Sequence, residues 1–175
     1  MTDTPRPATS YGRDRTREAR TVEDVTVTPV GTVVGGRTEA YDDDWNTEEA
    51  VIRLDGSRFA PGCLAGLETF SHLEVVFQFH LVDPGSVHTG ARRPRGNPDW
   101  PAVGIFAQRG KNRPNRLGVS RCRLLGVDGL DVRVRGLDAV DGSPVLDLKP
   151  YMAEFGPQGE VVQPAWATEL MRAYY

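Results

Sequence analysis

The chain of 175 residues has the length of one domain and can bury a core without disulfide or metal staples. Its formal net charge is −3, and no apolar run is long enough to cross a bilayer. The first residues are polar rather than signal-like, so we expect a cytoplasmic protein. Cys63 and Cys122 fit neither a disulfide framework nor a paired metal-binding spacing, and we expect reduced thiols packed as small hydrophobic residues.

The charge is unevenly distributed along the chain. Between Arg92 and Arg123 there are nine basic residues and one acidic residue, Asp99, whereas the remainder is strongly acidic. Such polarisation predicts a localised anion-binding face on an acidic body. An anionic small molecule, a nucleic-acid backbone or an acidic neighbouring subunit could use that face.

Residues 1–24 are rich in Pro, Thr, Arg and Asp and contain almost no large apolar side chain. They cannot bury enough surface to offset the entropy of ordering, so we predict a flexible tail. A basic arm that contacts RNA is the alternative. Residues 25–34 alternate β-branched side chains and predict a strand, in which Pro29 favours an edge or a bulge.

Residues 42–49 carry oxygen-bearing side chains that suggest a calcium loop. The glycine expected at the sixth position is Thr47, and the bidentate acid expected at the twelfth is Arg53. We therefore expect no metal site. Residues 50–54 predict the next short strand.

Residues 59–68 predict a turn of helix that ends near Gly66. Residues 71–81 form the strongest strand pattern in the chain, and their apolar density predicts burial on both faces. A long loop with three arginines follows at residues 82–102, and loops of that length are usually functional or disordered. Residues 164–175 predict a closing helix that begins after Pro164.

The stretch from Val103 to Tyr151 contains three predicted strands and two highly polar loops. We name residues 108–116 the cationic loop and residues 138–144 the anionic loop. Two loops of opposite charge suggest a site for a small molecule that carries both signs. The many short strands predict an all-β fold, a barrel or a sandwich. No glycine-rich fingerprint opens a helix, which argues against a Rossmann nucleotide site.

The central stretch resembles the TsaA-like or TrmO-like family of S-adenosylmethionine (SAM)-dependent tRNA methyltransferases. The resemblance spans about residues 27–151 and rests on these motifs: Phe70-Ser71-His72, Phe77-x-Phe79-His80, residues 104–109 (GIFAQR), residues 113–120 (RPNRLGVS) and residues 136–151 (GLDAVDGSPVLDLKPY). It implies an antiparallel β-barrel. Together with the short helical turns and the C-terminal helix predicted above, we expect residues 25–175 to form one such domain. The resemblance also implies a homodimer with SAM near the subunit interface and methyl transfer to N6 of threonylcarbamoyladenosine in tRNA.

The chain departs from the family pattern in two respects. Bacterial members carry a further C-terminal domain after the Lys-Pro-Tyr motif, and we expect this chain to be a short form without it. The usual Ser-Pro after the motif arginine is Gly110-Lys111 here, and the usual Asn-Pro is Asn115-Arg116. These changes add charge beside the expected cofactor pocket.

SAM carries a carboxylate, an ammonium, a sulfonium and an adenine, and the motifs offer a partner for each. A planar guanidinium suits the carboxylate best, and Arg109 or Arg113 could supply it. The remaining expected contacts are Asp138, Asp141 and Gly142 for the cationic groups, Leu117 for the adenine, and His80 and Leu81 by their place in the family motif. Asp138 or His80 could accept the proton that an exocyclic amine loses.

Each assignment has a purely structural alternative. Arg113 could be a solvated arginine in a rigid turn, and Asp138 and Asp141 could be turn or cap aspartates that bond their own backbone. His72 is interpreted as a hydrogen-bonded core histidine, with a catalytic role as the alternative. Trp45 and Trp100 could stack on a base or act as local packing lids.

Three functions remain open at this point. The first is a tRNA methyltransferase, and the second is a SAM-dependent methyltransferase for a small molecule or another modified base. The third is a non-catalytic SAM-binding dimer. Whether residues 42–45 contribute to a neighbouring subunit's site is likewise open.

Overall fold

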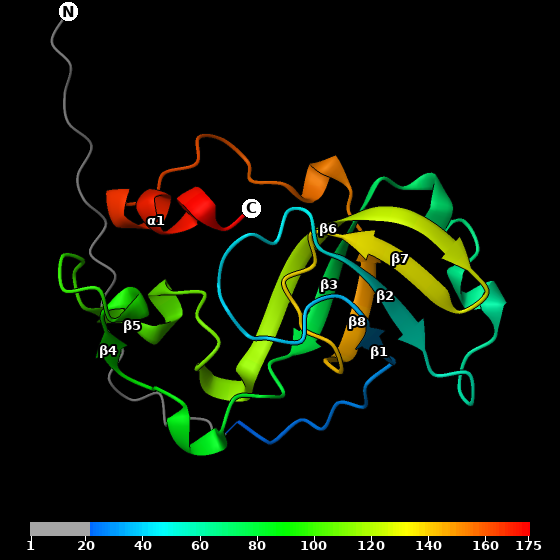
Figure 1. Ribbon diagram of the computed structural model, residues 1–175, viewed down its shortest axis with the longest axis horizontal. Helices are drawn as coiled ribbons and strands as arrows, with labels where there is room; N and C mark the ends of the chain where they lie inside the picture. The colour runs from blue at the N-terminus through cyan, green and yellow to red at the C-terminus, as the bar shows by residue number, and fades with distance from the viewer. Residues whose placement is uncertain (1–21) are drawn as a thin grey trace, which may run out of the picture.

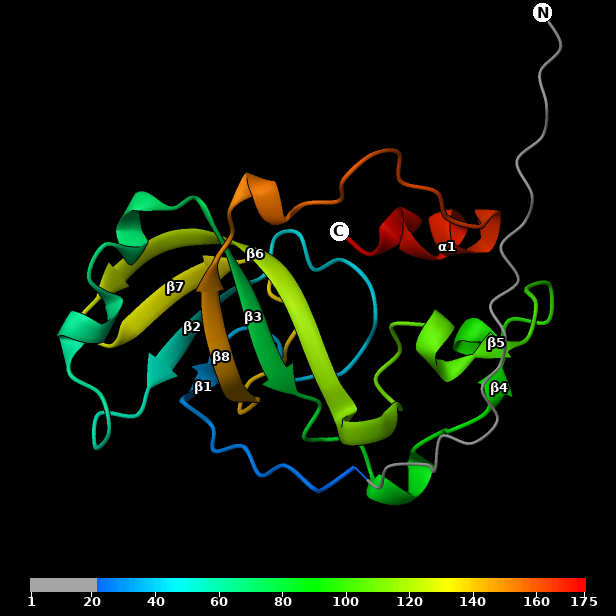
Figure 2. The same ribbon diagram turned by 180° about the vertical axis from the view of Figure 1, so that it is seen from behind.

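The computed structural model describes residues 22–175, and the predicted tail lies mostly outside this range. Six antiparallel strands close into a barrel in the order β1-β2-β7-β6-β3-β8 (Figures 1 and 2). These strands are β1 (Gly31–Val34), β2 (Glu49–Leu54), β3 (His72–Gln78), β6 (Leu117–Asp128), β7 (Asp131–Arg135) and β8 (Pro144–Pro150). The predicted all-β antiparallel barrel is confirmed, and the sandwich is not formed.

Strand β3 runs through the middle of the barrel wall, between β6 and β8. Leu73, Val75 and Phe77 point inward and are almost fully buried, whereas the intervening side chains are half-exposed. The prediction of burial on both faces was therefore wrong. The alternation follows from the barrel itself, in which one face of every strand packs inside and the other faces outward.

The core consists of inward side chains from all six strands. Val33, Ile52, Val132, Val134 and Val145 join the β3 residues in one cluster that excludes water. Burial of β-branched and aromatic side chains on the concave face is the main term that stabilises the barrel. Among residues 22–175, no helix is both long and apolar enough to span a membrane.

Strand β1 is shorter than predicted and begins only at Gly31. Pro29 precedes it and has no backbone N–H for a ladder, so the preceding alternation does not extend the strand. The predicted strand at residues 50–54 is present as β2, and the helical turn at 59–68 is present as two 3-10 helices, Pro61–Leu64 and Leu67–Thr69.

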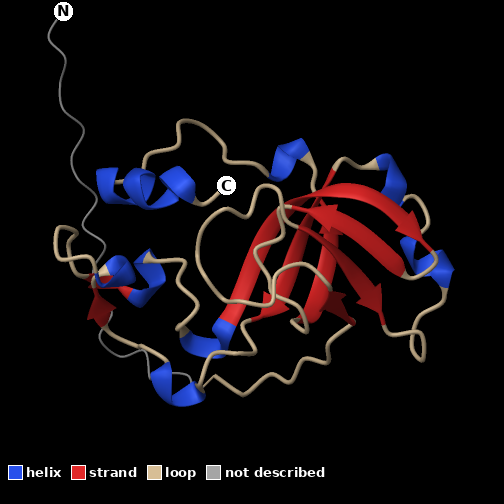
Figure 3. Cartoon of the chain, viewed as in Figure 1, coloured by secondary structure: helices blue, strands red, loops and turns tan. Residues whose placement is uncertain are grey.

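A second group of elements lies beside the barrel, next to β6 (Figures 1 and 3). It contains the small sheet of β4 (Ala91–Arg92) and β5 (Val103–Gly104) with several 3-10 helices. The C-terminal helix α1 (Ala165–Leu170) and the 3-10 helix Met171–Ala173 lie above it. The predicted closing helix is thus confirmed, and it begins directly after Pro164.

Candidate functional site

Arg109 leaves the cationic loop and reaches the edge of β6. Its Nη2 donates a hydrogen bond of 2.6 Å to the carbonyl oxygen of Val119. The preceding Gln108 is buried, and its amide donates to the carbonyls of Arg92 and Val103 at 2.9 and 2.8 Å. The small sheet therefore fixes the point from which Arg109 extends, and most of the Arg109 guanidinium fork stays open to a ligand.

The Arg113 side chain stabilises the cationic loop by bonding its backbone. Its Nη1 donates to the carbonyl oxygen of Gln108 at 3.1 Å, and Arg116 donates to the carbonyl of Val82 at 2.8 Å. The backbone of Asn115 and Arg116 has φ of 63° and 53°, so the loop turns sharply here. This arrangement favours the structural alternative for Arg113 over a fully open carboxylate clamp.

Asp138 begins the anionic loop and lies over the middle of β6. Its backbone N–H donates to Ser120 Oγ at 3.3 Å, and its Oδ2 accepts a hydrogen bond of 2.5 Å from the Tyr174 hydroxyl. Its Oδ1 is buried and has no hydrogen-bond partner within residues 22–175. A buried carboxylate oxygen without a donor is costly, which marks Asp138 as a position where a cationic or N–H ligand would be stabilised.

Asp141 has a different environment at the other end of the loop. Its Oδ1 accepts from the backbone N–H of Gly35 at 2.8 Å, and its own N–H donates to the carbonyl of Arg37. Gly142 has φ of 79°, a left-handed conformation that glycine adopts without strain. Asp141 therefore stabilises the turn that joins the anionic loop to the end of β1.

His80 follows the end of β3 and lies against that turn. Its Nδ1 is 3.3 Å from Ser143 Oγ, and its Nε2 faces Gly142. Leu81 and Leu117, the two predicted apolar contacts, are 60% and 37% exposed, so both remain accessible. The structure therefore brings His80 close to Gly142, two of the residues expected to contact SAM.

The two loops of opposite charge contact adjacent residues of β6, because Arg109 bonds the carbonyl of Val119 and the N–H of Asp138 bonds Ser120 Oγ. Burial and the negative charge of Asp138 raise the pKa of the Tyr175 hydroxyl to about 12, whereas a hydrogen bond with Ser120 and the positive charge of Arg109 lower it. The pKa of Tyr174 is raised further, by burial first and then by Asp138.

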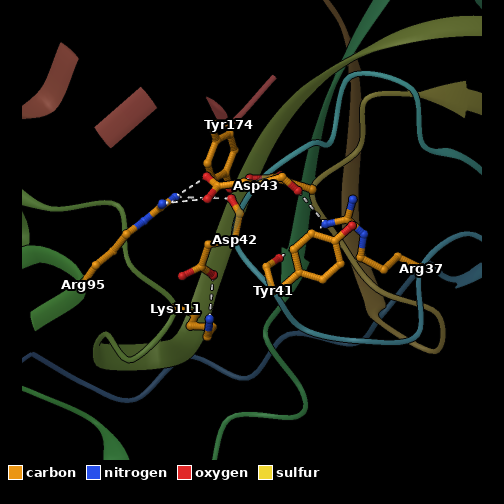
Figure 4. Close-up of polar contacts among 8 residues, drawn as sticks. Arg37, Tyr41, Asp42, Asp43, Arg95, Lys111 and Tyr174 are labelled. Atoms are coloured by element: carbon orange, nitrogen blue, oxygen red, sulfur yellow. Dashed lines mark hydrogen bonds and ion pairs between the residues drawn. The ribbon is translucent and has the colours of Figure 1, made fainter. Parts of the chain in front are cut away.

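Residues 42–45, which we name the acidic loop, are held by basic side chains from distant segments (Figure 4). Lys111 Nζ lies 2.6 Å from Asp42 Oδ1, and the Arg95 guanidinium binds both oxygens of Asp43 at 2.6 and 2.9 Å. The sequence analysis missed these pairs. Complementary charge in the cationic and acidic segments was the only signal for them.

Arg37 fixes the acidic loop from the barrel side. It donates to the carbonyl of Asp43 at 2.7 Å (Figure 4). It also donates to the carbonyl of Asp44 at 3.0 Å and forms an ion pair with Glu48 at 3.0 Å. Its guanidinium also stacks on the ring of Trp45, which is 4% exposed. Trp45 is therefore a packing residue in this chain rather than an exposed surface for a base.

The C-terminal segment contributes Tyr174, a residue to which the sequence analysis gave no role. The backbone N–H groups of Asp44 and Trp45 donate to the carbonyls of Ala173 and Tyr174, both at 2.9 Å. Trp100 Nε1 donates to Glu169 at 2.8 Å and ties the same segment to the long loop. These contacts direct the Tyr174 side chain onto Asp138.

A cleft of about 580 Å³ opens beside this cluster, where β7 ends and β6 continues with β3 as its neighbour on the other side. Its lining includes His72, Arg121, Cys122, Arg123, Arg135 and Tyr175. None of the residues predicted to bind SAM lines this cleft. His72 is exposed, although its Nδ1 lies 2.8 Å from Ser71 Oγ, so the predicted hydrogen bond is present and the predicted burial was wrong.

The two cysteines differ from the expectation in one respect. Both thiols are free, and Cys122 is buried, but Cys63 is exposed on the 3-10 helix Pro61–Leu64. Burial raises the pKa of Cys122 to about 12, so its thiol stays protonated. Cys63 therefore does not pack as a small hydrophobic residue.

Comparison with known proteins gives one family match. Residues 43–156 match the family described as the tRNA-methyltransferase O N-terminal domain. A human tRNA (adenine(37)-N6)-methyltransferase is 38% identical over 101 residues, which are 58% of this chain and 22% of the human protein. The Escherichia coli protein of the same name is 42% identical over 93 residues, which are 50% of this chain and 38% of that protein.

Other relatives agree with this match. A probable S-adenosyl-L-methionine-binding protein of Methanothermobacter thermautotrophicus is 40% identical over 97 residues, covering 54% of this chain and 64% of that protein. The crystal structure of TrmO from Pseudomonas aeruginosa superposes with a TM-score of 0.64 at 26% identity, covering 80% of this chain and 62% of that chain. The chain thus spans less than two thirds of each of these relatives.

Proposed function

The chain belongs to the family of the tRNA-methyltransferase O N-terminal domain, and from that premise we propose that it transfers a methyl group from SAM to N6 of an adenosine in tRNA. The observation that carries this proposal is Asp138, whose Oδ1 is buried without a partner among residues 22–175. The exposed guanidinium of Arg109 bonds Val119, next along β6 to Ser120, which Asp138 contacts. An anionic and a cationic group at one strand edge suit a zwitterionic ligand.

The residues present fit SAM. Arg109 has donors beyond the one on Val119 and would bind the carboxylate of the amino acid moiety. Asp138 and the turn at Asp141–Gly142 would face the ammonium and sulfonium, and Leu81 and Leu117 offer apolar contact for the adenine. His80 would lie at the same pocket because it contacts Gly142 and Ser143. Arg113 would act by holding the cationic loop.

SAM, when bound, supplies an already activated methyl group on its sulfonium. The protein therefore needs to orient the acceptor amine in line with that methyl and to exclude competing water. Asp138 is the residue that we assign to accept the amine proton, with His80 as the second candidate. The Tyr174 hydroxyl stabilises the Asp138 carboxylate and fixes its rotamer.

The proposal includes a cytoplasmic homodimer. Several large apolar side chains near the cationic loop are exposed, notably Leu81, Phe106 and Val119 at 60, 77 and 43%. A second copy that covers this surface would bury them beside the SAM pocket, as the family resemblance implies.

The small-molecule alternative rested on Lys111 and Arg116, which depart from the family pattern. Lys111 is paired with Asp42, and Arg116 donates to the carbonyl of Val82. Because both side chains are engaged within the chain, neither supplies a new acceptor pocket. This observation favours tRNA as the acceptor.

The proposal is tested by transfer of label from methyl-tritiated SAM. The protein is incubated with separate pools of tRNA and small metabolites, and we expect label in the tRNA pool, on N6 of adenosine after digestion. Label in the metabolite pool would establish the small-molecule function instead. Tight SAM binding in calorimetry with no labelled pool would indicate a non-catalytic SAM-binding protein.

A further inference from the structure

A row of basic side chains crosses the outer face of the barrel at the cleft beside β6. Arg123 on β6 stands opposite Arg135 on β7 and opposite His72 on β3. All three side chains are exposed and line the cleft of about 580 Å³. The strand register therefore aligns these three side chains, which come from separate parts of the sequence.

This register has an electrostatic cost. Like charges directly opposite one another on neighbouring strands destabilise a sheet. Arg135 is partly neutralised by Glu49 at 2.5 Å, but Arg123 forms no ion pair with any residue in the range 22–175. Arg121, the next outward residue on β6, bonds Glu74 through Nε only and keeps its other donors. An anion bound between these guanidinium groups would relieve the repulsion.

The shape and chemistry of the cleft identify the class of anion. Guanidinium forks bind phosphate oxygens with paired hydrogen bonds, and several forks in a row match successive phosphates of a nucleic-acid strand. The volume is in the range of pockets that hold a nucleotide-sized group. The ion pairs with Glu49 and Glu74 are solvent-exposed and therefore weak, so a phosphate could displace them.

We propose that the row of His72, Arg123 and Arg135 binds the phosphate backbone of the RNA acceptor. This inference rests on the proposed function, because it takes the acceptor to be RNA. Tyr175 lines the cleft, and its ring packs edge to face against Tyr174, whose hydroxyl bonds Asp138, so a strand held in the cleft passes close to the proposed methyl-transfer site. The row fixes the position of the RNA, and Asp138 acts on the acceptor nucleotide.

The test measures binding of a fluorescently labelled RNA stem-loop by anisotropy at several salt concentrations. We expect Arg123→Gln to raise the Kd about 5- to 10-fold and to lower the slope of log affinity against log salt by about one. The matched control is Arg133→Gln, an outward arginine on β7 that lies outside the cleft. It should leave affinity and slope close to those of the unchanged protein.

A second variant removes a negative charge from the cleft instead of a positive one. Glu49→Gln removes the only acidic side chain that lines the cleft among residues 22–175 and should tighten RNA binding about 2- to 5-fold. This variant keeps the inference testable if Arg123→Gln disturbs folding, which circular dichroism would detect. Unchanged or weaker binding by Glu49→Gln would overturn the assignment of the cleft.

Other outcomes separate this inference from the proposed function. Equal losses in Arg123→Gln and Arg133→Gln, or loss of SAM binding with RNA affinity intact, would overturn the RNA-binding row. If light scattering showed a change of oligomeric state in Arg123→Gln, the row would be a contact between copies of the chain. That result would also overturn its assignment as an RNA-binding site. If the row binds RNA as expected but no tRNA is methylated, the proposed function fails and the inference stands.

Discussion

At the scale of single residues, Asp138 differs from Asp141 although both lie in one polar loop. Asp141 bonds the N–H of Gly35 and serves a turn, whereas Asp138 keeps one oxygen buried and unpaired within residues 22–175. Asp141-Gly142 is a turn signal that Asp138-Ala139 lacks, but both residues lie in the family motif and no local pattern shows that Asp138 keeps an unpaired oxygen. The contact with Tyr174, more than thirty residues away, makes the difference.

Replacing Arg109 tests the proposed carboxylate contact. We expect Arg109→Ala to weaken SAM binding about 10- to 100-fold, because it removes a charge-assisted hydrogen-bond donor of roughly 1.5–3 kcal/mol. Arg121→Ala removes a similarly exposed arginine that bonds Glu74 and should leave the SAM Kd nearly unchanged. Calorimetric titration of both variants decides the point, and equal small losses would move the cofactor away from the cationic loop.

The Tyr174 hydroxyl offers a second test at this scale. Tyr174→Phe removes the donor to Asp138 Oδ2 and leaves that carboxylate with both oxygens unpaired among the described residues. We expect the free energy of unfolding to fall by about 1–3 kcal/mol, measured by urea denaturation. Tyr41→Phe is the control, because the Tyr41 side chain is 48% exposed and meets Arg37 through its ring face and backbone carbonyl rather than through its hydroxyl. An unchanged stability for Tyr174→Phe would show that this bond contributes nothing.

At the scale of elements, the C-terminal segment and the acidic loop form one unit over β6. Backbone hydrogen bonds join them, and Lys111 and Arg95 bind the acidic loop from the other side (Figure 4). The matching family region ends at residue 156, so Tyr174 comes from a segment outside it. Local sequence patterns predicted the helix but not its docking, because docking depends on residues far apart in the chain.

This unit predicts a loss of stability at high pH. Burial and Asp138 raise the pKa of Tyr174 and Tyr175 above the ordinary tyrosine value of about 10, and that of Tyr175 to about 12. The protonated hydroxyls therefore make their full contribution to the free energy of unfolding below about pH 10. That contribution is lost as the pH rises toward 12, because the tyrosines of the unfolded chain lose their protons at a lower pH than those of the folded chain. The urea midpoint should therefore fall above pH 10, and the fall should be smaller in Tyr174→Phe. An identical pH profile in both proteins would contradict this account.

At the scale of the whole molecule, the barrel was predictable and its charge distribution only partly so. The apolar and β-branched patterns predicted the positions of β2 and β3, and the resemblance to the family predicted that the strands close into a barrel. The basic segment from Arg92 to Arg123 does not form one anion-binding face, because Arg95 and Lys111 are neutralised by the acidic loop. The basic row at the cleft joins His72, Arg123 and Arg135 by strand register, and register is set by long-range pairing rather than by local pattern.

The closed barrel itself depends on a close contact between β3 and β6. Gly118 lies opposite Phe77, and a Cβ atom at Gly118 would come within 2.3 Å of the Phe77 ring. Phe77 is 1% exposed and cannot move outward without opening the core, so Gly118→Ala should destabilise the fold by about 1–3 kcal/mol. For a domain of this size, that loss lowers Tm by about 3–10 °C.

Gly126→Ala is the matched control for this prediction, because it lies on the same strand. Its added Cβ would meet only the end of the Arg133 side chain at 3.1 Å, which can shift into solvent. We therefore expect a smaller decrease in Tm for Gly126→Ala, measured by calorimetry under the same conditions. If the two variants melted alike, the contact of Phe77 with Gly118 would not limit the packing of β6 on β3. A larger decrease for Gly118→Ala is expected because inward volume in a small barrel is already filled, whereas its outer face is free to adjust.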